Sequence, residues 1–216
     1  MKIYNDLTSG LQSILLQATR GYSHCVSFEI ERAKLPALTA KWIDNYGVNL
    51  PAWKRFERKS NGLPNAWAAI LPVPGAPHQA RVVLLRTDAD LSKLPPESPW
   101  HRENWASRIE VGDYVVSTDQ RDRRDFTTTI KLTPRCISGL EAHWRSLANV
   151  CLNQLVHEIS HAVRFYPLFG GVRRQLRRQI RGYAKLWAKR MPGRPWPGPD
   201  PESLPTMHGF RAANSE

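Results

Sequence analysis

The N-terminal part of the chain contains segments whose apolar residues follow the spacing of either a helix or a strand. Apolar residues three and four positions apart predict helices, which Gly21 and Gly47 would end. Alternation, or a short apolar run beside a turn rich in proline and glycine, predicts strands. In chain order the predicted elements are helix 7–19, strand 22–30, helix 36–46, and strands 66–72 and 81–86. Residues 51–59 and 88–112 lack both patterns and are interpreted as loops.

The C-terminal part begins with a predicted hairpin and then becomes helical. Thr133 followed by Pro134 is typical of a helix start, because a hydroxyl caps the helix and proline suits its first position. The apolar stripe that follows continues to Val163 and predicts one long helix, which ends before Pro167. The predicted elements are strands 114–117 and 127–132, helix 134–165, helix 172–191 and a proline-rich extended tail over 192–216.

This order of elements predicts an α+β fold. The expected architecture is an antiparallel sheet of two hairpins plus an N-terminal strand, packed against two long C-terminal helices. Residues 1–191 would form a single domain, in which 134–191 is the helical part. With 41% hydrophobic and 23% charged residues, the composition supports a packed core and excludes global disorder.

Three features of the sequence predict a cytoplasmic protein. No apolar run reaches the roughly 18 residues of a membrane span. The first residues lack the uninterrupted apolar segment of a secretory signal. The three cysteines, Cys25, Cys136 and Cys151, are widely spaced and odd in number, which excludes a disulfide framework and a Cys-x-x-Cys zinc site.

Positive charge is the strongest signal in the composition. The chain has 31 Lys and Arg residues against 19 Asp and Glu residues, a net charge of +12, and no acid occurs from Ile159 to Pro199. The bases of that stretch carry nearly all of the excess. They are Arg164, Arg173, Arg174, Arg177, Arg178, Arg181, Lys185, Lys189, Arg190 and Arg194. Such a concentration of charge predicts a polyanionic partner, nucleic acid before an anionic membrane.

In the predicted helix 172–191 the bases form a stripe along the helix. Arg173, Arg177, Arg181, Lys185 and Lys189 follow one another at four-residue steps, with Arg174 and Arg178 beside them. Like charges at this spacing repel by a few tenths of a kcal/mol per pair, and no acid of the helix relieves them. Phosphates would relieve them and release counterions, which predicts binding to a nucleic-acid backbone. Gly170 and Gly171 would leave the first amides of the helix open to an anion as well. The alternative is an ordinary solvated face.

Residues 53–59 are a second candidate for nucleic-acid binding. Lys54, Arg55, Arg58 and Lys59 alternate there with Trp53 and Phe56. This pattern can contact phosphates and stack bases. The alternative interpretation is a surface loop whose two aromatic side chains are anchored in the core.

Residues 157–161 read His-Glu-Ile-Ser-His, the pattern of zinc peptidases. Histidines four positions apart, His157 and His161, share a helix face and can hold one Zn²⁺, with Glu158 as the general base. Against this, the surroundings are cationic, and the following helix offers no acid as a third ligand. The remaining candidates for that ligand are Asp200, Glu202 and His208. A polar helix face with three histidines, the third being His143, is the other interpretation.

Four strings of the sequence together resemble uncharacterised proteins carried by plasmids and integrative conjugative elements of proteobacteria. The strings are Tyr46-Gly47, 54–62 with Asn65-Ala66, 82–87 and 169–175. The resemblance implies a mobile genetic element and no particular activity. In the His-Glu-Ile-Ser-His string and the basic character alone, the chain also resembles SprT-like proteases.

The preferred hypothesis is a nucleic-acid-binding protein of a mobile genetic element, without a cofactor. It would contact the phosphate backbone of DNA or RNA with helix 172–191, assisted by residues 53–59. It would act alone or with protein partners in a nucleoprotein complex. The alternative is an enzyme, either a zinc-dependent metallopeptidase that uses residues 157–161 or a nuclease.

Overall fold

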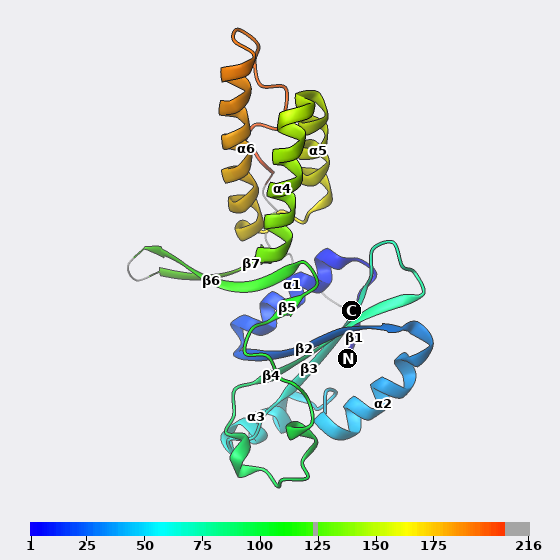
Figure 1. The fold of residues 1–216 in the computed structure, drawn as a ribbon. Coiled ribbons are helices and arrows are strands. Elements are labelled where there is room, and N and C mark those ends of the chain that lie inside the picture. Colours follow the sequence, from blue (N-terminus) through cyan, green and yellow to red (C-terminus); the bar gives the residue numbers. More distant parts are fainter. Residues whose placement is uncertain (123–124, 206–216) are drawn as a thin grey trace, which may run out of the picture. The chain divides into compact units, whose positions relative to one another are not determined.

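The computed structural model describes residues 1–122 and 125–205, which form two compact units (Figure 1). The first is Met1–Val111, and the second begins at Gly112. The mixture of helices and strands confirms the predicted α+β class. The sequence predicts one domain over 1–191, whereas the contacts within the chain divide these residues between the two units. Each unit has its own strands and its own helices.

The first unit is built on a four-stranded sheet. Its order is β1 (Lys2–Ile3), β3 (Ala66–Pro72), β4 (Gln79–Thr87) and β2 (Tyr22–Glu31). The central strand β4 pairs antiparallel with β3 and with β2, whereas β1 joins the edge of β3 in parallel. The predicted hairpin and N-terminal strand are therefore confirmed. The sheet is mixed rather than antiparallel, because β1 is parallel to β3. The sequence does not predict β1, since a strand of two residues is too short to show a strand pattern.

Helices cover both faces of this sheet. Helix α1 (Leu7–Thr19) packs on β3, where a side chain on Gly10 would collide with Leu71. Helix α2 (Leu35–Tyr46) follows the short 3-10 turn Arg32–Lys34 and contributes to the core on the other face. That core contains Trp42, Tyr46, Ala68, Val82 and Leu84. Because both faces are covered, β3 is a continuous run of buried apolar residues.

The irregular segment that follows β4 packs against the end of α2. It contains the 3-10 turns Leu91–Lys93 and Pro99–His101 and the short strand β5 (Glu110–Val111). The rings of Trp100 and Trp105 meet that of Tyr46 edge-on, with centroids 5.0 and 6.0 Å away. The Tyr46 hydroxyl also donates a hydrogen bond to the carbonyl of Pro99 at 3.1 Å. Aromatic contacts therefore hold a segment that has little secondary structure.

Residues 51–59 are not a loop, as the sequence predicts, but contain helix α3 (Ala52–Ser60). The N–H of Asn61 bonds to the carbonyl of Glu57 and that of Leu63 to the carbonyl of Arg58, and Gly62 ends the helix with φ 70°. Alanine, lysine, arginine and glutamate are good helix formers. The loop prediction is wrong because the large apolar residues of α3 do not face the core, so they form no inward stripe.

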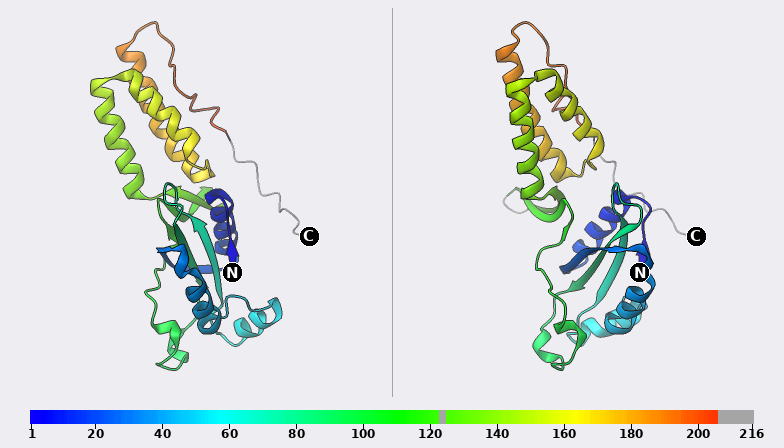
Figure 2. Two further views of the ribbon diagram at one scale, coloured as in Figure 1. Left: turned by 90° about the vertical axis from the view of Figure 1, so that its right-hand side faces the viewer. Right: turned by 45° about the vertical axis from the view of Figure 1, so that its right-hand side comes forward.

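The second unit begins with a hairpin of β6 (Tyr114–Asp122) and β7 (Asp125–Leu132), which extends the predicted strands. Helices α4 (Pro134–Val150), α5 (Leu152–Phe165) and α6 (Gly170–Arg190) follow, and each runs antiparallel to the one before it (Figure 2). Thr133 caps α4 by accepting a hydrogen bond from the N–H of Cys136 at 3.2 Å. The helical part predicted over 134–191 is therefore present, with three helices in place of two.

The single helix predicted over 134–165 is wrong because the chain reverses at Cys151, whose φ is −150° and ψ is 102°. No proline or glycine marks this reversal. One straight helix over this range would be about 48 Å long, at 1.5 Å per residue, and α6 could cover only part of its apolar stripe. The reversal lets Trp144 and Ala148 of α4 and Leu155 and Ile159 of α5 be buried in one bundle.

The start of α6 is fixed on strand β7. A Cβ atom on Gly171 would lie 2.4 Å from the carbonyl oxygen of Ile130, so only glycine permits this approach. Thr129 accepts a hydrogen bond from the N–H of Gly171 at 3.0 Å. The side chain of Gln175 accepts from the N–H of Leu132 at 2.8 Å and donates to its carbonyl at 3.1 Å. Gln175 thus pairs with β7 as the backbone of another strand would.

No helix in residues 1–122 or 125–205 combines the length and the apolar character needed to cross a lipid bilayer.

Candidate nucleic-acid interface

Helix α6 buries one face and exposes the opposite one. Val172, Leu176, Ile180 and Trp187 are buried on one side of the helix. At 3.6 residues per turn, the bases opposite this stripe share one face of the helix, and each of them is exposed. They are Arg174, Arg178, Arg181, Lys185 and Lys189. These five residues are called the basic face below.

Two of the predicted phosphate-binding residues, Arg173 and Arg177, lie at the border of the buried face and are half-buried. A step of four residues turns the helix by about 40°, so the predicted row of five bases winds around α6. Arg190 points elsewhere and donates a hydrogen bond to the carbonyl of Ala148 at the end of α4. The predicted stripe of seven therefore separates into the basic face and two border arginines.

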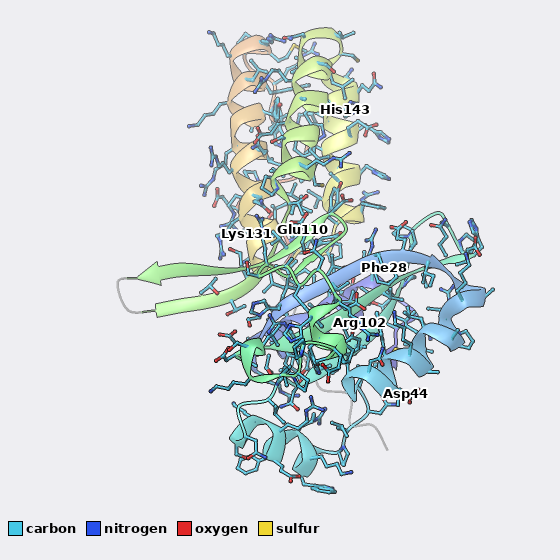
Figure 3. All side chains as sticks on the ribbon, turned by 60° about the horizontal axis from the view of Figure 1, so that its bottom comes forward. Phe28, Asp44, Arg102, Glu110, Lys131 and His143 are labelled. Atoms are coloured by element: carbon cyan, nitrogen blue, oxygen red, sulfur yellow. The ribbon has the colours of Figure 1, made fainter. Side chains whose placement is uncertain are left out.

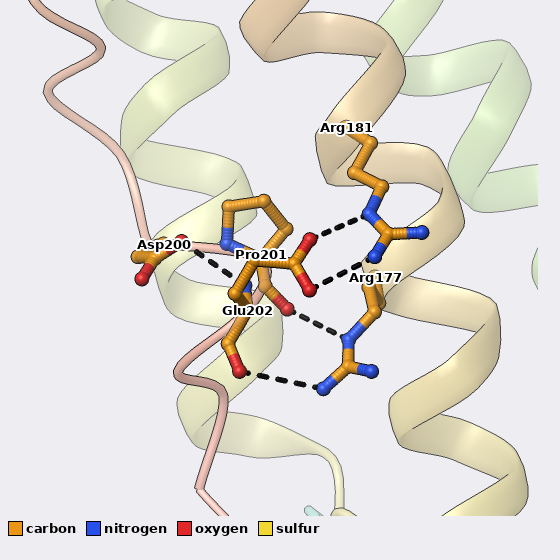
Figure 4. Close-up of polar contacts among 5 residues, drawn as sticks. All are labelled: Arg177, Arg181, Asp200, Pro201 and Glu202. Atoms are coloured by element: carbon orange, nitrogen blue, oxygen red, sulfur yellow. Dashed lines mark hydrogen bonds and ion pairs between the residues drawn. The ribbon is translucent and has the colours of Figure 1, made fainter.

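The tail that follows α6 returns along the helix and contacts Arg177 and Arg181 (Figure 4). The carboxylate of Glu202 accepts two hydrogen bonds from the Arg181 guanidinium, at 2.7 and 2.9 Å. Arg177 donates to the carbonyl of Pro201 at 2.8 Å. Leu204 is buried as well, so the described part of the tail is held in place. Arginine presents the same fork of donors to a phosphate, which shows that this part of α6 can bind an oxyanion.

The contact between Glu202 and Arg181 is fully formed at neutral pH. The hydrogen bonds from Arg181 lower the pKa of the Glu202 carboxyl below its usual value. Because the pKa is depressed in the folded chain, the contact contributes above the ordinary pKa of a glutamate and is lost as the pH falls through the lowered value. The tail contact therefore does not change with pH in the physiological range.

The side chains of three residues of the basic face, Arg178, Lys185 and Lys189, have no hydrogen bond or ion pair within residues 1–122 and 125–205. Their side chains project from the exposed side of α6. Fully solvated lysine and arginine side chains keep both their charge and their donors available to a ligand. This trio is consequently the part of the predicted site that a phosphate backbone can reach without displacing another group.

The first amides of α6 are less open than Gly170 and Gly171 suggest in the sequence. The N–H of Gly171 donates to Thr129, and that of Arg173 donates to the carbonyl of Phe169 at 2.8 Å. These bonds satisfy donors that an anion would otherwise use. The prediction of an anion site at this helix end is therefore not supported by the geometry.

The four bases of segment 53–59 that are predicted to bind nucleic acid also divide into half-buried and exposed side chains. Arg58 faces inward: its Nε donates to the carbonyl of Pro64 at 3.1 Å, and its guanidinium lies over the Trp100 ring, 5.6 Å from the centroid. Burial lowers the pKa of Arg58 from its ordinary value. Arg55 is half-buried, whereas Lys54 and Lys59 are exposed. The two lysines are thus the cations of α3 that face solvent fully.

The His-Glu-Ile-Ser-His string lies on α5, but its two histidines and its glutamate do not line the same pocket. A pocket of about 190 Å³ between α4 and α5 is lined by Glu158, His161 and His143, the last from α4 (Figure 3). His157 is exposed and is not part of this lining. The ring of His161 stacks on that of Phe165, 5.9 Å between centroids.

The structure supplies no third zinc ligand among the residues that it describes. Within that part of the chain, no three His, Cys, Asp or Glu side chains are grouped closely enough to hold a metal ion. Of the sequence candidates, Glu202 binds Arg181, Asp200 accepts a hydrogen bond from the N–H of Glu202 at 3.0 Å, and His208 lies outside the described residues. The zinc hypothesis for Glu158, His157 and His161 gains no support from the geometry.

Sequence reasoning missed one feature of the site and left a second one open. One is the tail contact: Glu202 is one of the first two acids after a stretch that has none, so charge complementarity was the available signal. The other is the orientation of Trp53 and Phe56, which are exposed by 64% and 74% rather than anchored in the core. No pattern in the sequence distinguishes these two orientations, because both place aromatic residues beside cations.

Comparisons with protein-family models, with curated proteins and with solved structures found no match for this chain. The resemblance to proteins of mobile genetic elements therefore stays a prediction.

Proposed function

We propose that this protein binds nucleic acid, and that the basic face of α6 contacts the phosphate backbone. One observation carries the proposal. The basic face consists of five exposed cations on one side of a helix that contains no acid, and three of them have no partner within the described residues. Folding alone does not favour such an arrangement, because the cations repel one another.

The dimensions of the basic face suit several consecutive phosphates. From Arg174 to Lys189 it extends about 22 Å, at 1.5 Å per residue. This length corresponds to roughly six base pairs of a duplex, whose rise is about 3.4 Å. Contacts of this kind carry no sequence information, so binding is proposed to depend on the backbone and little on the base sequence.

The direct test is the binding of the full chain to fluorescent DNA and RNA, single-stranded and double-stranded, measured by anisotropy over a salt series. With three to five phosphate contacts, the logarithm of the affinity is expected to fall with the logarithm of the salt concentration with a slope of about 2–5. Binding that is absent, or that does not change with salt, contradicts the proposal. Weak binding alone and strong binding in a co-purified assembly would assign the protein to a nucleoprotein complex.

The tail contact makes a separate prediction about Arg181. A Glu202→Ala variant is expected to bind a duplex up to about fivefold more tightly, because the Arg181 guanidinium loses its carboxylate partner and becomes available for a phosphate contact. The measurement is the same anisotropy titration. The matched control is Glu97→Ala, which removes one exposed carboxylate without a side-chain partner in the described residues. Equal gains in the two variants would attribute the effect to net charge alone.

A further inference from the structure

The exposed face of α3 carries two large aromatic side chains that are mostly open to solvent. Trp53 is 64% exposed and Phe56 is 74% exposed. All eight tryptophans of the chain lie in the described residues, and Trp53 is the only exposed one. Two aromatic residues three positions apart lie on the same face of a helix. Leaving them in water forgoes the stabilisation that burying such side chains contributes, so their exposure calls for a ligand.

The opposite side of α3 is fixed to the body of the unit. Arg58 binds the Pro64 carbonyl and packs on Trp100, and the side-chain amide of Asn65 donates to the carbonyl of Arg55 at 2.8 Å. Asn65 itself is buried. These contacts hold the helix from beneath, so Trp53 and Phe56 are presented on a supported surface element rather than on a free loop.

The charges around the two rings favour an anionic ligand. The Lys54 ammonium lies over the Trp53 ring, 5.2 Å from its centroid. Lys59 is exposed about one helical turn after Phe56. Glu57 is the only acid of the helix. The surface thus combines flat apolar rings with cations, and single-stranded nucleic acids combine flat bases with phosphates.

From this arrangement we infer that α3 binds unpaired bases, which stack on Trp53 and Phe56 while Lys54 and Lys59 contact the adjoining phosphates. The inference rests on the proposed function and specifies its ligand as single-stranded nucleic acid. Bases of a duplex are stacked on one another and expose only their edges in the grooves, so they offer these rings no free face. Stacking tolerates any base, which agrees with binding that depends little on sequence.

An anionic membrane fits this surface less well. Helix α3 has nine residues and is about 14 Å long, and it offers two apolar side chains on its exposed face. Stable attachment to a bilayer requires a larger apolar area or a second anchor. The exposed face also contains Glu57 and Ser60, which are unfavourable in contact with acyl chains.

The test compares a Trp53→Ala/Phe56→Ala variant with the natural chain, using a labelled polypyrimidine strand and a duplex of the same length. Affinity for the single strand is expected to fall about 30-fold, whereas affinity for the duplex changes by less than about twofold. A Trp53→Phe/Phe56→Tyr variant keeps both rings and should retain the affinity. Val150→Ala serves as control, because Val150 is 85% exposed at the end of α4. Both aromatic side chains are exposed, so unchanged thermal unfolding is expected in all variants.

The outcomes separate the inference from the proposed function. Equal losses for strand and duplex, or no loss for the strand, overturn the stacking inference while leaving phosphate binding in place. A natural chain that binds neither nucleic acid contradicts the proposed function itself. Vesicles of phosphatidylcholine and phosphatidylserine complete the test. A blue shift of tryptophan emission on vesicles that the Trp53→Phe/Phe56→Tyr variant lacks, without quenching by the single strand, would assign α3 to a membrane surface and overturn the inference.

Discussion

Replacing Arg178, Lys185 and Lys189 together with alanine is expected to lower the affinity for duplex DNA about 100-fold at roughly 0.1 M salt. Each of the three contributes about 1 kcal/mol at an exposed site, and every 1.4 kcal/mol is a factor of ten. The slope of log affinity against log salt should also decrease by about 3, because each lost phosphate contact removes about 0.9. Anisotropy titrations over a salt series measure both quantities.

A variant with the same loss of charge in the first unit serves as the control for this experiment. The side chains of Lys2, Arg32 and Lys41 are exposed and belong to no hydrogen bond or ion pair in the described residues. Their replacement with alanine should lower the affinity by less than about threefold, through the weaker long-range field. If both triple variants lose affinity equally, net charge rather than the basic face is responsible. Thermal unfolding of the α6 variant should be unchanged or slightly improved, since repulsion along the helix is relieved.

The choice of this trio depends on the structure and not on the four-residue spacing. The spacing alone favours Arg173, Arg177 and Arg181 as the central contacts. Two of these, however, hold the tail, and Arg173 is half-buried at the edge of the packed face. Their replacement would change the packing of the tail and the charge together. The three side chains without such contacts isolate the electrostatic effect.

The elements that were predictable from the sequence are those with a buried stripe. Helices α1, α2 and α6 bury apolar residues at helical spacing and strands β3 and β4 bury apolar runs, and the prediction for each agrees with the structure. Helix α3 has no such buried stripe, because its large apolar residues Trp53 and Phe56 are exposed. The reversal at Cys151 was not predictable either, since the helical spacing on both sides continues through it. Local patterns record which residues are buried, but not which other segment buries them.

The same reasoning explains why the candidate site was only partly predictable. The bases of α6 form a local pattern, and the sequence shows it. The position of Glu202 on Arg181 depends on the burial of Leu204 and on the ring contact of Trp196 with Trp187 of α6. Such contacts follow from the packing of the whole unit. Only the three-dimensional structure therefore shows which bases of α6 are exposed, which are half-buried and which already contact the tail.

The attachment of α6 to β7 determines the second large effect, on stability. Replacing Gly171 with alanine is expected to lower the free energy of unfolding by roughly 2–3 kcal/mol, because the new methyl group would collide with the backbone carbonyl of Ile130. Neither the strand nor the helix start can move easily, since Thr129 and Gln175 join them by hydrogen bonds. Urea denaturation followed by circular dichroism measures the difference.

Gly182, in the middle of the same helix, is the matched control for Gly171. It is exposed, and a Cβ atom there would have no neighbour within 4 Å. Its replacement with alanine should raise the free energy of unfolding by up to about 1 kcal/mol, because alanine is the better helix former. Opposite signs at the two positions are therefore expected for the same chemical change. If both substitutions stabilise the protein, the close approach of α6 to β7 is not present in solution, and the orientation of the basic face would have to be determined anew.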